Sequence, residues 1–120
     1  MRRIFNALLM AAILTMMAAC GNTHKAKGLV EDYIEQHYQG EKIDIQNFGK
    51  LDSTTRVSPQ AINNMRQEIG KEAKWKKADY KKATPVLRYI MVSYKVNDKE
   101  IHQTFYLTST LDGVVAFKNN

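Results

Sequence analysis

The chain contains three histidines, and their spacing decides whether a metal site is expected. His24, His37 and His102 lie far apart in the sequence. A bound metal needs several ligands within about 2 Å, and two histidines four residues apart on a helix are the usual sign of such a site. The sequence therefore predicts no metal site. At the end of a predicted helix, the imidazole of His37 would meet the negative end of the helix dipole, which explains it without a metal.

The carboxylates and serines also lack a catalytic arrangement. The carboxylates are scattered and fall mostly on predicted polar faces, so no spacing forces a pair into a partly buried site where their pKa values would shift. No serine stands in a G-x-S-x-G context, and the chain has no glycine-rich phosphate loop. We therefore expect a protein that is not an enzyme and carries no cofactor.

The stretch KEAKWKKADYKK, residues 71–82, interleaves six lysines with two aromatic residues. Lysine, tryptophan and tyrosine favour an anionic bilayer surface, and aromatic residues are also favoured at the centre of protein interfaces. Alternatively, the two aromatic residues cap the core while the lysines form a solvated surface. The candidate binding patch, for anionic lipid or an acidic envelope protein, consists of Lys74, Trp75, Lys76, Lys77, Tyr80 and Lys81.

The only cysteine ends an apolar N-terminal run. Arg2 and Arg3 precede residues 4–19, which are apolar except for Asn6 and Thr15. Basic residues, a short apolar segment and small residues form the layout of a signal peptide. The run is shorter than the roughly 20 apolar residues of a membrane span. The sequence therefore predicts export.

Met17-Ala18-Ala19-Cys20 resembles the lipobox of bacterial lipoproteins, with methionine where leucine is commonest. The resemblance implies that residues 1–19 are a lipoprotein signal peptide and that Cys20 is acylated and anchors the protein in the bilayer. Two or three acyl chains would anchor it firmly. A cell-envelope location follows. Because no aspartate adjoins Cys20, the resemblance favours the outer membrane, facing the periplasm. The alternatives are a secretory leader cut after Ala19 and an uncleaved anchor.

The remaining chain is expected to comprise a lipidated tether, residues 20–27, and one small domain, residues 28–120. Without Arg2 and Arg3, 16 of the 18 lysines and arginines remain against 12 aspartates and glutamates, a side-chain charge of +4. This charge suits anionic lipid or an acidic protein and is too low to predict nucleic-acid binding.

Hydrophobic periodicity predicts two helices. Apolar residues at spacings of three and four indicate a helix over residues 25–39, ended by Gly40 at positive φ. Ser58-Pro59 combines an N-cap hydroxyl with a proline in the first turn and begins a second helix. That helix ends at Gly70 or continues to Lys77.

Alternating apolar residues predict the strands. One strand begins at Ile43 and continues irregularly towards Val57; another begins after Pro85 and is apolar on both faces, which is typical of a covered, central strand. Two further strands, Ile101 to Thr108 and Val114 to Phe117, follow turns at residues 97–99 and 112–113. We expect positive φ at Gly113.

The order helix, strand, helix and three strands predicts an α+β fold in which two helices pack on one face of a small, mostly antiparallel sheet. Over residues 28–118 this order resembles cystatin-like and NTF2-like domains. The favoured hypothesis is a non-catalytic binding module for another envelope protein, in the manner of an inhibitor, immunity factor or assembly accessory. The alternative is a small-ligand carrier or enzyme with an NTF2-like cavity lined by Tyr33, Tyr94 and Phe105.

Overall fold

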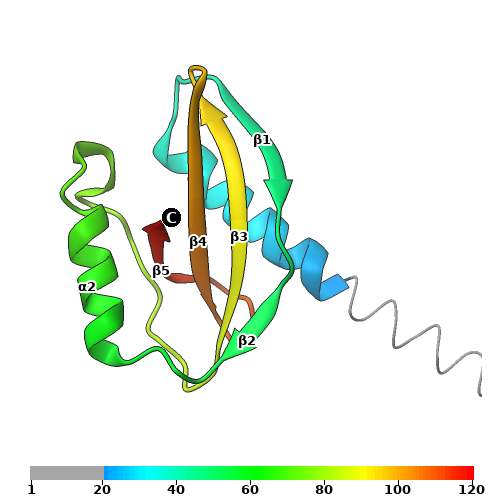
Figure 1. The fold of residues 1–120 in the computed structure, drawn as a ribbon, viewed down its shortest axis with the longest axis vertical. Coiled ribbons are helices and arrows are strands. Elements are labelled where there is room, and N and C mark those ends of the chain that lie inside the picture. Colours follow the sequence, from blue (N-terminus) through cyan, green and yellow to red (C-terminus); the bar gives the residue numbers. More distant parts are fainter. Residues whose placement is uncertain (1–20) are drawn as a thin grey trace, which may run out of the picture.

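The computed structural model describes residues 21–120 as two helices packed against a five-stranded antiparallel sheet (Figure 1). The first helix crosses one face of the sheet, and the second lies beside its last strand. The predicted α+β fold, with two helices packed against a mostly antiparallel sheet, is therefore confirmed, although the second helix packs with Leu87 on the face opposite the first helix and not on the same face. The leader and Cys20 lie outside the described residues.

The first helix is described over residues 21–37, so it begins earlier and ends earlier than the predicted range of 25–39. Ala26, Val30 and Ile34 follow one another at intervals of four, and all three are fully buried. Gly40 adopts a φ of 81°, which confirms its predicted position after the helix. Residues 21–27, expected to form a tether, are helical, and Ala26 belongs to the core.

Helix α2 (Pro59–Ile69) begins as predicted, because the Ser58 hydroxyl accepts a hydrogen bond of 3.1 Å from the Ala61 N–H. The helix ends before Gly70, and a separate 3₁₀ turn, η1 (Ala73–Trp75), follows it. Arg66 fixes α2 beside the last strand, since its Nε donates to the Val115 carbonyl at 2.9 Å. The helix therefore covers the edge of that strand.

The sheet is built around β3 (Leu87–Val96), which pairs with β4 (Lys99–Thr108) on one side. On its other side β3 pairs with β1 (Ile43–Phe48) and with β2 (Asp52–Thr54). The predicted irregular strand is thus two strands, and β1 contains a bulge between Ile45 and Asn47. Strand β5 (Val114–Asn119) pairs with β4 and completes the sheet.

Strand β3 is central, as predicted, but only one of its faces is fully covered. Ile90, Val92 and Tyr94 point towards the first helix and are buried. On the opposite face Leu87 packs in a small cluster with α2 and β5, whereas Met91 is 50% exposed. The prediction of a strand covered on both faces was therefore wrong, because α2 covers only the β5 end of the outer face.

The two hairpin turns differ in how they use special backbone conformations. Asn97 and Asp98 both have positive φ between paired Val96 and Lys99, which confirms the predicted tight turn. In the second turn positive φ falls on Leu111 and not on Gly113, so that prediction was wrong. Glycine is required at position 113 for space, because a Cβ there would overlap the side chain of Lys81.

Asp112 stabilises the second turn through the Thr108 hydroxyl. That hydroxyl donates to the Asp112 carboxylate and accepts from the Asp112 N–H at 2.9 Å. The hydrogen bond from Thr108 lowers the pKa of Asp112.

We predict that Asp112→Asn lowers the melting temperature at neutral pH. A depressed folded-state pKa contributes stability above the ordinary value of 3.8, and that contribution is lost as the pH falls through the lowered pKa. The melting temperatures of the two proteins should therefore converge in acid. Asp98→Asn, the same change in the other turn, is the control, and a difference that persists unchanged at low pH would contradict the role of the carboxylate.

Candidate binding surfaces

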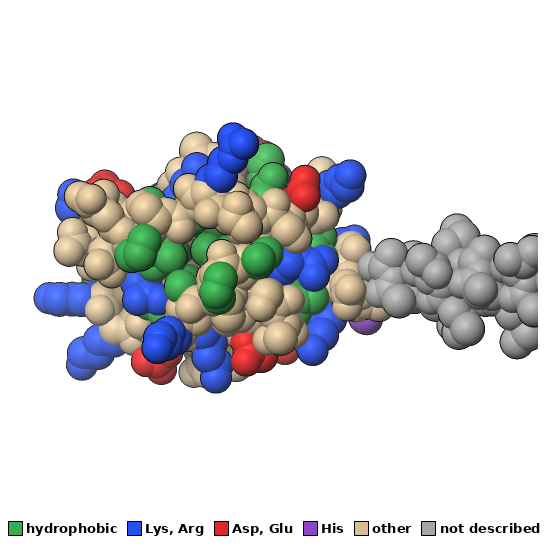
Figure 2. Space-filling view, turned by 90° about the horizontal axis from the view of Figure 1, so that it is seen from below, with side chains coloured by type: hydrophobic (Ala, Val, Ile, Leu, Met, Phe, Trp, Pro, Cys, Tyr) green, Lys and Arg blue, Asp and Glu red, His purple; other side chains and the backbone are tan. Residues whose placement is uncertain are grey.

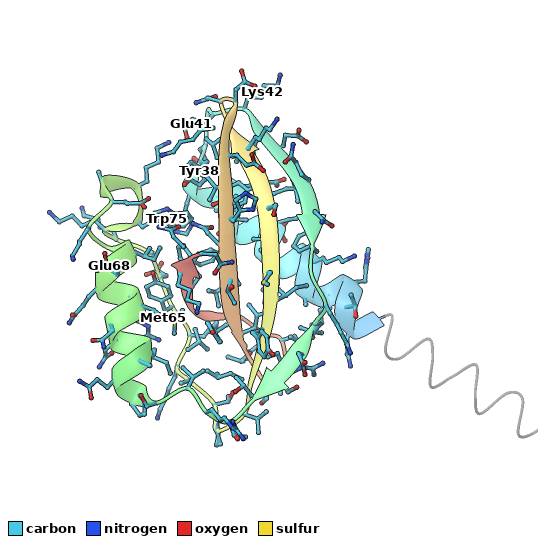
Figure 3. All side chains as sticks on the ribbon, in the orientation of Figure 1. Tyr38, Glu41, Lys42, Met65, Glu68 and Trp75 are labelled. Carbon is cyan, nitrogen blue, oxygen red and sulfur yellow. The ribbon has the colours of Figure 1, made fainter. Side chains whose placement is uncertain are left out.

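Trp75, at the centre of the lysine-rich stretch, is a core residue. Its side chain is 1% exposed. The indole lies between the end of the first helix and β5, with ring centroids 4.5 Å from His37, 5.4 Å from Tyr38 and 4.7 Å from Phe117. Figure 3 shows Trp75 pointing towards the sheet below Tyr38. Trp75 is therefore not available as an exposed anchor for a partner.

Tyr80 is half-buried and stabilises the segment that leads back to the sheet. The Arg66 guanidinium lies 4.9 Å from its ring centroid, and the Tyr33 ring lies 6.4 Å away. The Tyr33 hydroxyl donates to the Asp79 carbonyl at 3.1 Å. Burial raises the pKa of both tyrosines. Their phenols thus remain neutral and have a structural role.

The four lysines of the candidate patch have different environments. Lys74 forms an ion pair with Glu41 and lies 4.7 Å above the centroid of the Tyr38 ring. Lys81 packs over Gly113 and donates its backbone N–H to the Val114 carbonyl at 2.8 Å. Lys76 and Lys77 are exposed immediately after η1. The structure therefore separates the patch into two aromatic residues that pack inward and an exposed set of lysines.

Lys74 and the two lysines that follow η1 lie towards the end of the first helix that is farther from Cys20, whereas Lys81 lies beside the middle of that helix, near Leu29 and Tyr33. Trp75 and Lys74 contact His37, Tyr38 and Glu41, which end or follow that helix. At about 1.5 Å per residue, residues 21–37 span about 24 Å. Figure 1 shows the loop after α2 at the opposite side of the domain from the start of the helix. Lys76 and Lys77, which follow η1, are thus remote from the predicted lipid anchor.

The proposed cavity residues lie in the main core. Tyr94 and Phe105 are fully buried, and the Phe105 ring stacks on Phe117 at 4.6 Å. Tyr33 packs edge-on against both phenylalanines at 6.0 and 5.8 Å. Trp75 fills the space on the other side of Tyr33, with stacked rings 5.9 Å apart. These side chains pack against one another, so they fill the volume in which the predicted cavity would lie.

A surface groove of about 590 Å³ lies between the η1 segment and β4. Tyr38, Glu41 and Glu72 form one side, and Ile101, Gln103 and Asn119 contribute to the other. This groove could not be predicted from the sequence, because its walls come from distant segments of the chain. The only sequence signal was a glutamine at a position of β4 that faces the core.

Three polar side chains form a hydrogen-bonded chain on the open face of the sheet. Ser93 Oγ lies 2.9 Å from His102 Nδ1, and His102 Nε2 lies 3.1 Å from Glu100 Oε1. The order serine, histidine and carboxylate is that of a hydrolytic triad. However, the side chains of His102 and Glu100 are more than half exposed, so water screens the charges that such a site must stabilise. The arrangement is best explained as cross-strand pairing, since Ser93 faces His102 directly.

His37 is also accounted for by local contacts, because its Nδ1 lies 2.8 Å from the Tyr33 carbonyl. Within residues 21–120 no three histidine, cysteine, aspartate or glutamate side chains gather as a metal would require. No helix in this part of the chain has the length and apolar character to span a bilayer.

Comparisons with models of protein families, with curated proteins and with solved structures gave no match for this chain.

Proposed function

We propose that the protein is a cell-envelope lipoprotein, anchored in the bilayer through Cys20, that binds another envelope protein without catalysis. The N-terminal sequence supports the anchor. The packed aromatic core supports surface binding: Tyr94, Phe105 and Trp75 fill the space in which the alternative, a carrier or enzyme, would hold a ligand. This filled core is the observation that carries the proposal.

The exposed lysines after η1 are the proposed contact for an acidic surface of the partner. Lys76 and Lys77 follow η1, which packs against the far end of a helix that begins at residue 21 and is about 24 Å long. The helix is already formed at residue 21, so little slack separates the domain from the anchor. Of the two possible partners for the lysines, this geometry favours a protein in the periplasm and disfavours the bilayer in which Cys20 is held.

We predict that Lys76→Glu with Lys77→Glu greatly weakens the binding of one specific partner protein. The tagged full-length lipoprotein would be crosslinked in cells, purified and analysed by mass spectrometry. We expect one dominant protein to be recovered at about one tenth of the wild-type amount or less, because two attractive charges become repulsive. Lys50→Glu with Arg56→Glu, an equal charge change at exposed positions elsewhere, is the matched control.

Equal recovery with both double variants would contradict the lysine contact. Binding of the wild type and the same variants to anionic vesicles tests the remaining alternative, which is that the lysines bind anionic lipid. If Lys76→Glu with Lys77→Glu weakens vesicle binding and changes no protein crosslink, the lysines bind lipid and the proposed protein partner is wrong.

A further inference from the structure

The groove beside η1 exposes an unpaired part of a sheet edge. Strand β4 pairs with β3 over its whole length, whereas β5 pairs only with Gln103–Leu107. Asn120 extends this pairing by one bond, from its N–H to the His102 carbonyl at 2.9 Å. Among residues 21–120, no strand lies beside β4 before His102.

The period of the strand shows which backbone groups face this open edge. The His102 carbonyl points away from β3, towards Asn120. Backbone groups of alternate residues in a strand point to the same side, so the N–H and C=O of Glu100 also point away from β3. A free donor and acceptor therefore adjoin the groove at Glu100.

The other two edges of the sheet are protected. Arg66 donates to the Val115 carbonyl of β5, and Lys81 donates to the Val114 carbonyl. Strand β1 carries a bulge at its centre, which disfavours addition of another strand. The start of β4 combines a regular, unpaired edge with an adjoining groove.

A hydrogen-bonded chain runs from the core to the groove wall. Buried Tyr94 donates to Gln103 at 2.6 Å, Gln103 donates to Asn119 at 2.9 Å, and Asn119 donates to Glu72 at 3.2 Å. Gln103 is 1% exposed. The chain fixes β4, β5 and the η1 side of the groove relative to one another, so the groove exists before a partner arrives.

The charges of the groove favour a basic occupant. Its lining contains three glutamates and two lysines, although the chain after Cys20 is basic. Lys74 is paired with Glu41, whereas the Glu72 carboxylate accepts a hydrogen bond from the neutral amide of Asn119 and forms no ion pair within residues 21–120. A lysine or arginine side chain beside Glu72 would gain a charge-assisted hydrogen bond.

We propose that the partner inserts an extended segment with a basic side chain into this groove, where it adds as a short strand beside Glu100 of β4. This inference rests on the proposed function, because it specifies how the bound envelope protein is held. Addition of a strand to a sheet edge uses backbone hydrogen bonds for affinity and side-chain contacts for specificity. Lys74 lines the groove and stands two residues before Lys76 in the chain, so both contacts can belong to one interface.

The test uses phage-displayed random nonapeptides selected on the full chain in detergent micelles. Glu100→Pro removes the free N–H, which β3 does not use, and proline is tolerated at such an edge. Glu100→Ala removes the same carboxylate and keeps the N–H. We expect the selected peptides to be rich in lysine or arginine and to bind Glu100→Pro at least about tenfold more weakly than Glu100→Ala.

A second pair of variants keeps the test decisive if Glu100→Pro does not fold. Glu72→Lys reverses the charge in the groove wall, and Glu68→Lys makes the same change on α2 outside the groove. Selected peptides should lose binding to Glu72→Lys and retain it to Glu68→Lys. Peptides that bind all folded variants equally, or a selection that enriches none, would overturn the strand docking. The crosslinking experiment with Lys76→Glu and Lys77→Glu does not depend on this result. A partner that is lost in that variant would still support the proposed function, so failure of this inference is distinct from failure of the proposed function.

Discussion

Replacing Trp75 by alanine should lower the free energy of unfolding by about 3–5 kcal/mol, the usual cost of removing a large buried aromatic side chain. The indole is 1% exposed and contacts four aromatic rings contributed by the first helix and β5. Its removal leaves a cavity where η1 is held against the rest of the domain. Urea denaturation followed by circular dichroism measures the loss.

Trp75→Phe is the matched control, because phenylalanine keeps an aromatic ring in the same site. We expect this variant to lose clearly less stability than Trp75→Ala. If Trp75→Ala costs less than about 1 kcal/mol, the side chain is not part of the core. The same reasoning excludes Trp75→Ala as a probe of binding, since a lost partner could then reflect lost folding. The charge variants at Lys76 and Lys77 avoid this problem.

Replacing Cys20 by alanine should leave an unlipidated, unprocessed precursor that no longer fractionates normally with the membrane. The lipobox resemblance implies acylation at the Cys20 thiol, and the chain has no other cysteine. Acyl chains contribute about 0.8 kcal/mol per buried methylene, so their loss removes most of the affinity for the bilayer. Labelling with a radioactive fatty acid and fractionation of the envelope measure both effects.

Asn22→Ala, two residues later, is the control for Cys20→Ala, and it should be labelled and fractionated as the wild type. Normal acylation and membrane fractionation of Cys20→Ala would show that the anchor lies elsewhere.

The parts of the fold that depend on local sequence were predictable. Ser58-Pro59, Gly40 and the turn after Val96 each depend on the chemistry of one or two residues, and the structure confirms all three. The α+β order followed from periodicity, because each helix and each long strand carries its own apolar pattern. The early start of the first helix was missed since Ala26 is too small to mark a buried face.

The features that depend on distant contacts were not predictable. Gly113 is required by Lys81, which lies more than thirty residues earlier and reaches the turn only through folding. Trp75 stands among lysines, so its neighbours suggested a surface, although one large apolar side chain is enough to draw the segment onto the core. The groove at Glu100 depends on where β5 ends relative to β4.

The most direct test of a protein-binding surface at the far end of the first helix is site-specific photo-crosslinking in cells. A photoreactive residue would replace Lys76, and in a separate strain it would replace Gln46, an exposed position on the opposite edge strand β1. A protein-binding surface there should give one discrete crosslinked protein from position 76 and none from position 46. No crosslink from position 76, or the same products from both positions, would contradict it.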